Sequence, residues 1–210
     1  MSHCDNRSTV SSALRAVLVA GAAVRGPHPA RHPAPDQGRC GGLGVTRVLV
    51  AYGSKRRGTA GLATMIGDAL AEAGYPSVVM PARDVRELVG VDAVIVAGAL
   101  YANRWHRDAR RFVRRHATRL RGLPVWLVSS GPLDDSASLG DIPPTKQVAK
   151  LVERAGARGH ITFGGALAAD AKGFPASAMA KTKSGDWRDA EQVRRWVATI
   201  VPQLSPAGGS

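Results

Sequence analysis

The sequence predicts an α/β fold, a doubly wound sheet of five parallel strands, on two observations. Five short segments are apolar throughout instead of alternating between apolar and polar residues, which is typical of parallel strands buried on both faces. Segments with apolar residues at helical spacing separate most of these strands, as in repeated strand–helix units. Ligands bind outside the carboxyl ends of the strands in such sheets. The loops that follow the strands are therefore the first candidates for function.

The first predicted strand, residues 48–52, lies between Arg47 and Gly53. The helix that follows is expected to begin at Thr59, a residue type that suits an N-cap, and its apolar residues recur at helical spacing as far as Ala73. The remaining strands are predicted at 77–80, 92–98, 125–129 and 159–168. The remaining helices are predicted at 106–120, from Pro143 or Pro144 to 155, and at 187–201.

Two connections have weaker patterns. Residues 81–90 predict a brief helical or irregular crossover, with Val85, Leu88 and Val89 facing inward. Residues 169–185 predict a longer insertion after the fifth strand.

Composition limits the class of protein. Hydrophobic residues make up 44% of the 210, enough for a core, and the net charge of +13 favours acidic partners, phosphates or anionic membrane surfaces. Cys4 and Cys40 provide neither a disulfide framework nor a Cys/His cluster with metal spacing. This cysteine usage fits a reducing compartment, and no apolar stretch approaches the length of a membrane span. We therefore predict a cytoplasmic protein without a metal site.

Residues 1–44 differ from the rest of the chain. Prolines alternate with His, Ala and Arg between 27 and 35, and such a segment buries too little surface to order itself. An apolar patch at 13–24 superficially resembles a secretory signal. We predict that 1–44 is a disordered tail, or a misannotated one with translation starting at Val45. The domain then spans 45–204, and 205–210 form a second disordered tail.

Three loops follow predicted strands and carry small, hydroxyl-bearing or aromatic residues: 53–58, 99–105 and 129–134. The first combines hydroxyls, a glycine and three cations ahead of a helix. A helix N-terminus with free N–H groups is a ready anion site, so this loop predicts phosphate binding. The alternative is an ordinary strand–helix turn with exposed charges. No Ser/His/Asp or paired-carboxylate arrangement indicates hydrolysis.

These loops carry a family resemblance. The segments VLVAYGSKRRGTAGLA, VIVAGALYANRWHRDARRFVRRHATRL, LVSSGPLDD, FGGAL and GDWRDAEQVRRW resemble the flavodoxin-like proteins over 45–204. The chain is most similar to the subgroup that includes the FMN-dependent, quinone-linked protoporphyrinogen oxidase. The resemblance implies the strand order 2-1-3-4-5 and FMN bound non-covalently at the strand ends.

The resemblance also implies a set of cofactor-binding residues. Loop hydroxyls and N–H groups would hold the phosphate, and Tyr101 and Trp105 would flank the flavin ring. Arg57 stands where the loop usually has glycine, and Gly61 replaces a more usual polar or acidic residue. Alternatively, Trp105 caps the following helix against the core, and His106 is a helix-start residue and not a catalytic base. The expected cofactor contacts are Ser54, Lys55, Arg56, Arg57, Gly58, Thr59, Ala99, Leu100, Tyr101, Asn103, Trp105, Ser129, Ser130, Gly131 and Pro132.

The helix predicted at 106–120 bears on partners, because arginines wrap much of its surface. It is either a solvated face or an electrostatic contact with an anionic membrane, an acidic redox partner or a porphyrinogen substrate. Nucleic acid is not expected, since no recognition motif accompanies the charge. The predicted function is an FMN-dependent oxidoreductase acting on a porphyrinogen with a quinone, at the inner face of a membrane or in the cytoplasm. The alternatives are a simple electron shuttle and a flavin-free binding module.

Overall fold

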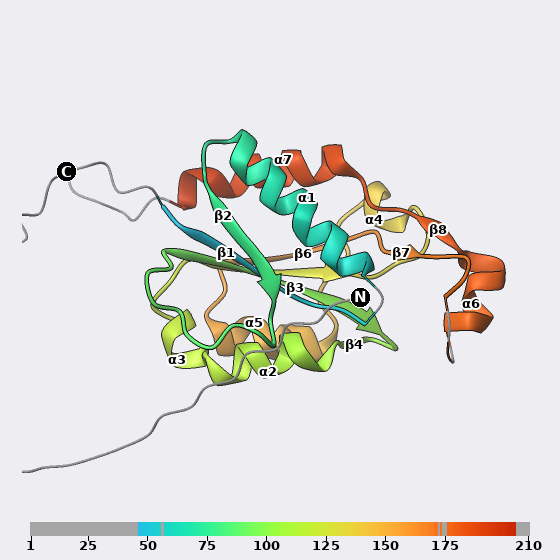
Figure 1. The fold of residues 1–210 in the computed structure, drawn as a ribbon, viewed down its shortest axis with the longest axis horizontal. Helices are drawn as coiled ribbons and strands as arrows, with labels where there is room; N and C mark the ends of the chain where they lie inside the picture. The colour runs from blue at the N-terminus through green and yellow to red at the C-terminus, as the bar shows by residue number, and fades with distance from the viewer. Residues whose placement is uncertain (1–45, 56, 172, 174–175, 205–210) are drawn as a thin grey trace, which may run out of the picture. The chain divides into compact units, whose positions relative to one another are not determined.

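A central parallel sheet organises the protein. The computed structural model describes residues 46–55, 57–171, 173 and 176–204 of the 210-residue chain. The five main strands are parallel and pair in the order β2-β1-β3-β5-β6 (Figure 1), which confirms the predicted fold and order. Their bounds are β1 Val48–Gly53, β2 Ser77–Pro81, β3 Ala93–Tyr101, β5 Val125–Ser130 and β6 Gly159–Phe163. A two-residue strand, β4 (Arg104–Trp105), pairs antiparallel with β3 alone.

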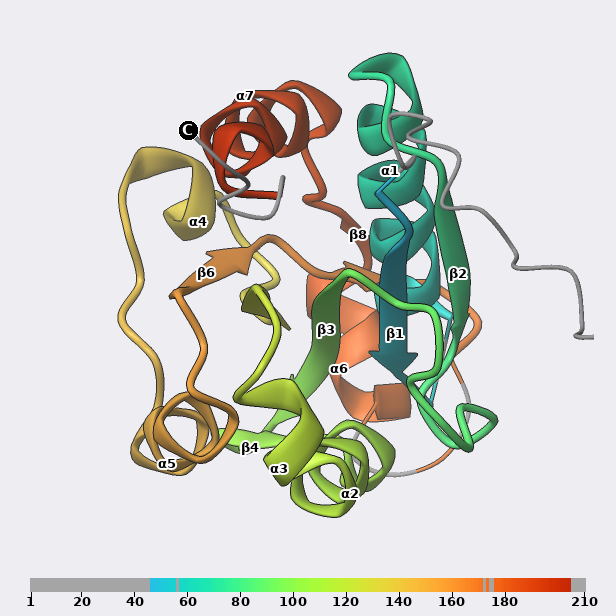
Figure 2. The same ribbon diagram turned by 90° about the vertical axis from the view of Figure 1, so that its left-hand side faces the viewer.

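Helices cover both faces of this sheet (Figure 2). On one face lie α1 (Gly58–Glu72) and α7 (Ala190–Ile200), which is followed by the 3-10 turn η1 (Val201–Gln203). On the other face lie α2 (Arg107–Arg115), α3 (Ala117–Leu120) and α5 (Lys146–Ala155). The short helix α4 (Ser136–Leu139) lies in the connection between β5 and α5. This three-layer arrangement is why the strands carry apolar residues at successive positions.

Each face of the sheet has its own core. Val50 and Ile95 are fully buried toward α1 and α7, whereas their neighbours Leu49, Val94 and Val96 pack toward α2 and α5. Burying a side chain of this size contributes about 1.5–3 kcal/mol relative to exposure. The two cores fix the sheet rigidly, and with it the edge from which the loops emerge.

The predicted basic helix is in fact two helices. It ends at Arg115, and His116 takes a non-helical conformation (φ −103°, ψ 12°) before α3 begins. The His116 ring tilts against the ring of Phe112, with centroids 4.9 Å apart, and α3 brings Leu120 fully into the core. Tertiary packing therefore overrides the helical continuity that the sequence pattern indicated.

The crossover from β2 to β3 contains no helix between residues 81 and 92, so it is the irregular alternative that forms. Val85 and Leu88 are buried as predicted, but Val89 is 83% exposed. The expectation that Val89 faces inward was wrong, because the turn before Gly90, with φ of 68°, carries it outward.

The fifth predicted strand is also shorter than expected. It leaves the sheet after Phe163, and Gly164 and Gly165 lead into β7 (Ala166–Leu167), which pairs antiparallel with β8 (Gly185–Asp186). A Cβ at Gly164 would clash with the Trp187 carbonyl, so only glycine permits this approach. The predicted insertion contains α6 (Ala176–Lys183). The predicted tails at 1–44 and 205–210 lie outside the described residues.

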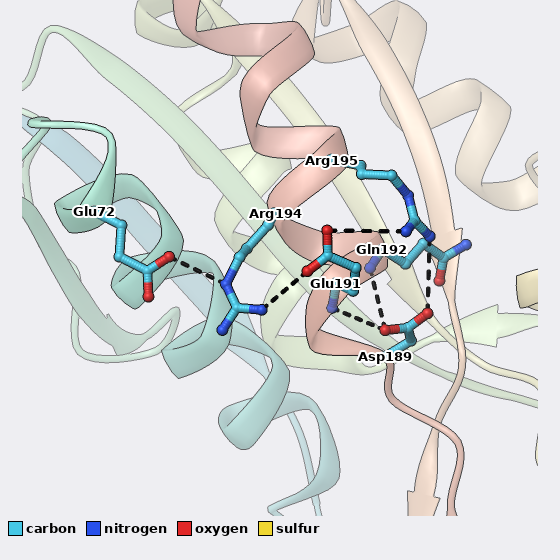
Figure 3. A network of polar contacts seen from close by, with 6 residues as sticks. All are labelled: Glu72, Asp189, Glu191, Gln192, Arg194 and Arg195. Carbon is cyan, nitrogen blue, oxygen red and sulfur yellow. Dashed lines mark hydrogen bonds and ion pairs between the residues drawn. The ribbon is translucent and has the colours of Figure 1, made fainter.

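Ion pairs join α7 to α1 at the end of the chain (Figure 3). Arg194 contacts Glu72 of α1 at 3.1 Å and Glu191 at 3.2 Å, and Arg195 approaches Asp189 and Glu191. Asp189 also caps α7, because its carboxylate accepts the Glu191 and Gln192 N–H groups. The arginines of α7 are thus matched by acids.

Candidate functional site

Loops from the carboxyl ends of β1, β3 and β5 converge on one cavity of about 310 Å³. This volume is at the lower end of the range for small-molecule and cofactor sites. A fourth segment, around β7 and the end of α6, completes the wall. The lining residues are Ser54, Gly58, Thr59, Ala99, Leu100, Tyr101, Ser130, Gly131, Pro132, Leu133, Asp134, Gly165, Ala166, Leu167 and Lys183.

The loop after β1 places Ser54, Gly58 and Thr59 on this cavity. The helix begins at Gly58, and Arg57 precedes it in the left-handed conformation (φ 61°, ψ −16°) without a side-chain cap. Thr59 is therefore not the N-cap that the sequence indicated; it lies in the first turn and is 2% exposed. A left-handed residue ahead of a helix start is a backbone geometry that turns N–H groups toward an anion.

The loop cations lie elsewhere. Lys55 and Arg57 line a separate hollow of about 230 Å³, together with Arg83 and Asp108. Ser54 lines both this hollow and the main cavity. Arg56, also predicted as a contact, lies outside the described residues. Among the described residues of this loop, Ser54, Gly58 and Thr59 line the main cavity, whereas Lys55 and Arg57 do not.

The loop after β3 is a tight hairpin. Ala102 and Asn103 both have positive φ, 46° and 60°, which is the pattern of a two-residue turn between antiparallel strands. Ala99, Leu100 and Tyr101 line the cavity, and the Tyr101 side chain is 38% exposed. Asn103 is exposed at the tip and does not line the cavity.

Trp105 is a core residue and not part of the cavity wall. It is 1% exposed and packs flat on β3, where a Cβ at Gly98 would lie within 2.7 Å of Trp105 Cε2. Its Nε1 donates to Ser129 Oγ at 2.8 Å, and that oxygen lies 2.8 Å from His160 Nε2. Burial lowers the pKa of His160 to about 4, so the ring is neutral at pH 7.

Ser129 is likewise enclosed by this network and is 1% exposed, so the structure separates both Trp105 and Ser129 from the other predicted contacts. Asp108 N–H approaches the His106 ring nitrogen at 3.4 Å, which makes His106 the N-cap of α2. Burial is the main cause that lowers the pKa of His106. The helix-start interpretation of His106 accounts for its position.

The loop after β5 supplies the opposite wall with Ser130, Gly131 and Pro132, three of the expected cofactor contacts. Asp134, which lies further along, was not predicted; its carboxylate accepts the Ser136 hydroxyl, which lowers the pKa of Asp134. The β7 residues and Lys183 were also missed. The glycine pair before β7 was the available signal, because such pairs mark turns.

Arg188, which follows β8, contacts the start of α1. Its guanidinium pairs with the Asp186 carboxylate and donates from Nη1 to the Gly58 carbonyl at 3.2 Å. A side chain at Gly61 would clash with this guanidinium. The unusual glycine at 61 thus makes room for Arg188, which braces the loop that lines the cavity.

The arrangement suits a flat, partly apolar ligand with a polar group at one end. The loops after β3 and β5 form two largely apolar walls, and the hydroxyls of Ser54 and Thr59 lie beside the start of α1. Among the described residues, no group of three or more His, Cys, Asp or Glu side chains is placed to hold a metal ion. Within the same ranges, no helix is both long and apolar enough to cross a bilayer.

Comparisons with known proteins agree with this fold. The family described as "Flavodoxin domain" matches residues 49–181. No curated protein matches the chain. Among solved structures, a rubredoxin oxygen:oxidoreductase from Desulfovibrio gigas has a TM-score of 0.52 at 16% identity. That match covers 75% of this chain but only 36% of the oxidoreductase.

Two flavodoxins match over nearly their whole length. A flavodoxin variant from Pseudomonas aeruginosa has a TM-score of 0.51 and 17% identity, and the alignment covers 76% of this chain and 99% of that one. A flavodoxin from the domain Archaea has a TM-score of 0.51 and 15% identity, with the same coverage. At these identities, the structural likeness supports the fold alone.

Proposed function

This chain belongs to the flavodoxin domain family, and on that premise we propose that it binds FMN non-covalently in the 310 Å³ cavity and transfers electrons. The observation that carries the proposal is the convergence of the loops after β1, β3 and β5 on that one cavity. FMN supplies reversible hydride and electron chemistry when bound, so the protein needs only to hold, orient and shield it.

The residues present fit such a cofactor. Ser54 and Thr59 offer hydroxyls beside the first turn of α1, where backbone N–H groups favour a phosphate. Leu100 and Tyr101 on one side and Pro132 on the other provide surfaces for a planar ring. Lys55 and Arg57 add positive charge behind the phosphate loop without occupying the cavity.

The test is a visible absorption spectrum of the purified protein, with identification of the cofactor released on denaturation. We expect flavin bands and FMN. Tyr101→Ala should release FMN more readily, because Tyr101 is the one aromatic side chain that lines the cavity within the described residues. Thr199→Ala, on the distant end of α7, is the control and should leave FMN binding unchanged. A colourless protein that binds no added FMN would instead support the flavin-free module.

We further propose that a porphyrinogen is the electron donor and a quinone the acceptor. Supporting this substrate class, Lys183 lines the cavity and the arginines of β4 and α2 begin beside Tyr101, so anionic propionates would meet positive charge. The test is anaerobic oxidation of protoporphyrinogen with a water-soluble quinone, followed by porphyrin fluorescence. Lys183→Gln should raise KM more than it lowers kcat. Flavin binding without this oxidation would identify a simple electron shuttle.

A further inference from the structure

One side of the molecule carries a dense set of arginines without acidic partners. We call it the basic face; it comprises Arg104, Arg110, Arg111, Arg114, Arg115 and Arg119. None of these six guanidinium groups makes an ion pair with any described residue, and Asp108 is the sole acid on α2 and α3. Buried Nε of Arg110 has no hydrogen-bond partner in the described part of the chain. Burial and the nearby arginines both lower the pKa of Arg110.

The opposite side of the sheet behaves differently. On α7, both arginines contact carboxylates, and Arg194 bridges to α1 (Figure 3). An arginine-rich composition therefore does not by itself leave arginines unpaired in this protein. Like charges that face each other without acids destabilise the free protein, and an anionic partner would relieve that repulsion.

A groove continues the basic face between α3 and α5. Its volume is about 580 Å³, and four cations line it: Arg114, Arg121, Lys150 and Arg154. Glu153 is its single acid, and it makes no ion pair with a described residue. The groove thus offers carboxylate side chains of a partner four cations and one acid.

The basic face also adjoins the cavity. Arg104 pairs with Tyr101 in the β3–β4 hairpin, and Tyr101 lines the cavity while remaining 38% exposed. A macromolecule seated on the basic face would therefore contact the hairpin that forms one cavity wall. Such proximity suits a protein that exchanges electrons with the bound cofactor.

We propose that the basic face and its groove dock an acidic protein that serves as the redox partner. This inference rests on the proposed flavin function. An acidic protein fits better than a membrane for two reasons. Among the described residues, the exposed large apolar side chains are Val78, Val89, Tyr101 and Leu139, and all four lie off α2, α3 and α5, so these helices present no large apolar side chain for insertion into a bilayer. A flat lipid surface would also leave the groove unfilled, whereas a carboxylate-bearing segment matches it.

The experiment measures binding of a fluorescent poly-L-glutamate peptide to the full chain by anisotropy at low salt. Its groove variant is Arg114→Gln with Arg154→Gln, and its matched control is Arg194→Gln with Arg195→Gln on α7. Both remove two positive charges. We expect the groove variant to weaken binding about tenfold and the control less than about twofold, since Arg194 and Arg195 already contact carboxylates whereas Arg114 and Arg154 make no ion pair with a described residue. Co-sedimentation with vesicles of phosphatidylcholine and phosphatidylglycerol is measured in parallel.

Three results would overturn the proposal: equal losses in the two variants, no peptide binding by the wild type, or vesicle binding that is stronger than peptide binding and depends on the groove. Flavin absorbance of each variant separates this test from the proposed function. A protein that is colourless and binds no added FMN, but shows groove-dependent peptide binding, would refute the flavin function and keep the docking surface. A flavin-loaded protein without groove-dependent peptide binding would refute the docking surface and keep the flavin function.

Discussion

Arg57 offers the sharpest test of the local structure, because its backbone takes a conformation that suits glycine. Its φ of 61° places it in the left-handed region immediately before α1. For a residue with a side chain, that region costs roughly 1–2 kcal/mol. Glycine avoids this cost but loses roughly 0.5–1 kcal/mol more backbone entropy on folding. Arg57→Gly should therefore stabilise the protein by about 0.5–1 kcal/mol.

The assay is urea unfolding followed by circular dichroism, with the midpoint and slope both fitted. The midpoint should rise while the slope stays constant, because the surface exposed on unfolding is unchanged. Arg57→Ala is the matched control: it removes the same charge but keeps a Cβ in the left-handed region. We expect no gain from alanine. If alanine stabilises as much as glycine does, the gain comes from charge and the reasoning about strain fails.

The same pair of variants tests the phosphate loop. Arg57→Gly should bind FMN more tightly than Arg57→Ala, since both variants lose the positive charge behind the phosphate loop but only glycine relaxes the left-handed backbone. Titration of the apoprotein, followed by quenching of FMN fluorescence, gives the dissociation constant. Binding by Arg57→Gly that is no tighter than binding by Arg57→Ala would refute the idea that backbone strain at residue 57 weakens the phosphate loop.

Three further predictions follow from the core and the Arg188 contact. The pKa of His160 is lowered to about 4, so between about pH 6.5 and 4 the unfolded chain binds a proton that the folded protein does not. The free energy of unfolding should therefore decrease by about 1–2 kcal/mol as the pH drops through that window, after discounting for the partial exposure of the ring. Urea unfolding at several pH values would measure this decrease. A His160→Gln variant should lack this slope. Gly98→Ala should destabilise by about 1–3 kcal/mol, because its Cβ would push into the Trp105 ring; an unchanged urea midpoint would contradict that packing. Gly61→Ala should destabilise the wild-type protein, because the added Cβ would clash with the Arg188 guanidinium. In an Arg188→Ala background, the same substitution should stabilise the protein by up to about 1 kcal/mol, since alanine favours the helix more than glycine does. Equal effects of Gly61→Ala in the two backgrounds of this double-mutant cycle would argue against the contact.

The parallel strands were predictable because their signal is local and redundant. Val48, Val50 and Ile95 lie in runs whose successive residues are all apolar, so both faces of each strand are apolar. Burial on both faces could therefore be inferred from the sequence alone. Three of the four cavity walls followed from the same logic, since they are the loops after those strands. The flavodoxin domain match supports the coarse family resemblance, but nothing in the comparisons distinguishes the oxidase subgroup.

The features that sequence analysis missed depend on contacts between distant residues. From the sequence, Trp105 fits equally well as a side chain that flanks a flavin ring or as a core residue. The close approach of Gly98 and the hydrogen bond to Ser129 show that it is a core residue. The wall around β7 depends on the chain leaving the sheet after Phe163, which the apolar run did not indicate. Thr59 fits an N-cap by type, yet the left-handed Arg57 shifts the helix start by one residue.

The reach of Arg188 to Gly58 has a consequence for the order of assembly during synthesis. The two residues are 130 positions apart, so the first loop gains its brace only after all five main strands of the sheet have left the ribosome. Contacts of such long range slow folding because the intervening chain must be closed first. A truncated nascent chain that ends before residue 188 lacks both this brace and α7, which buries Val193 and Val197 against α1. The brace on the loop that lines the proposed cofactor cavity therefore forms late in synthesis, after the strands that carry the other cavity loops have emerged.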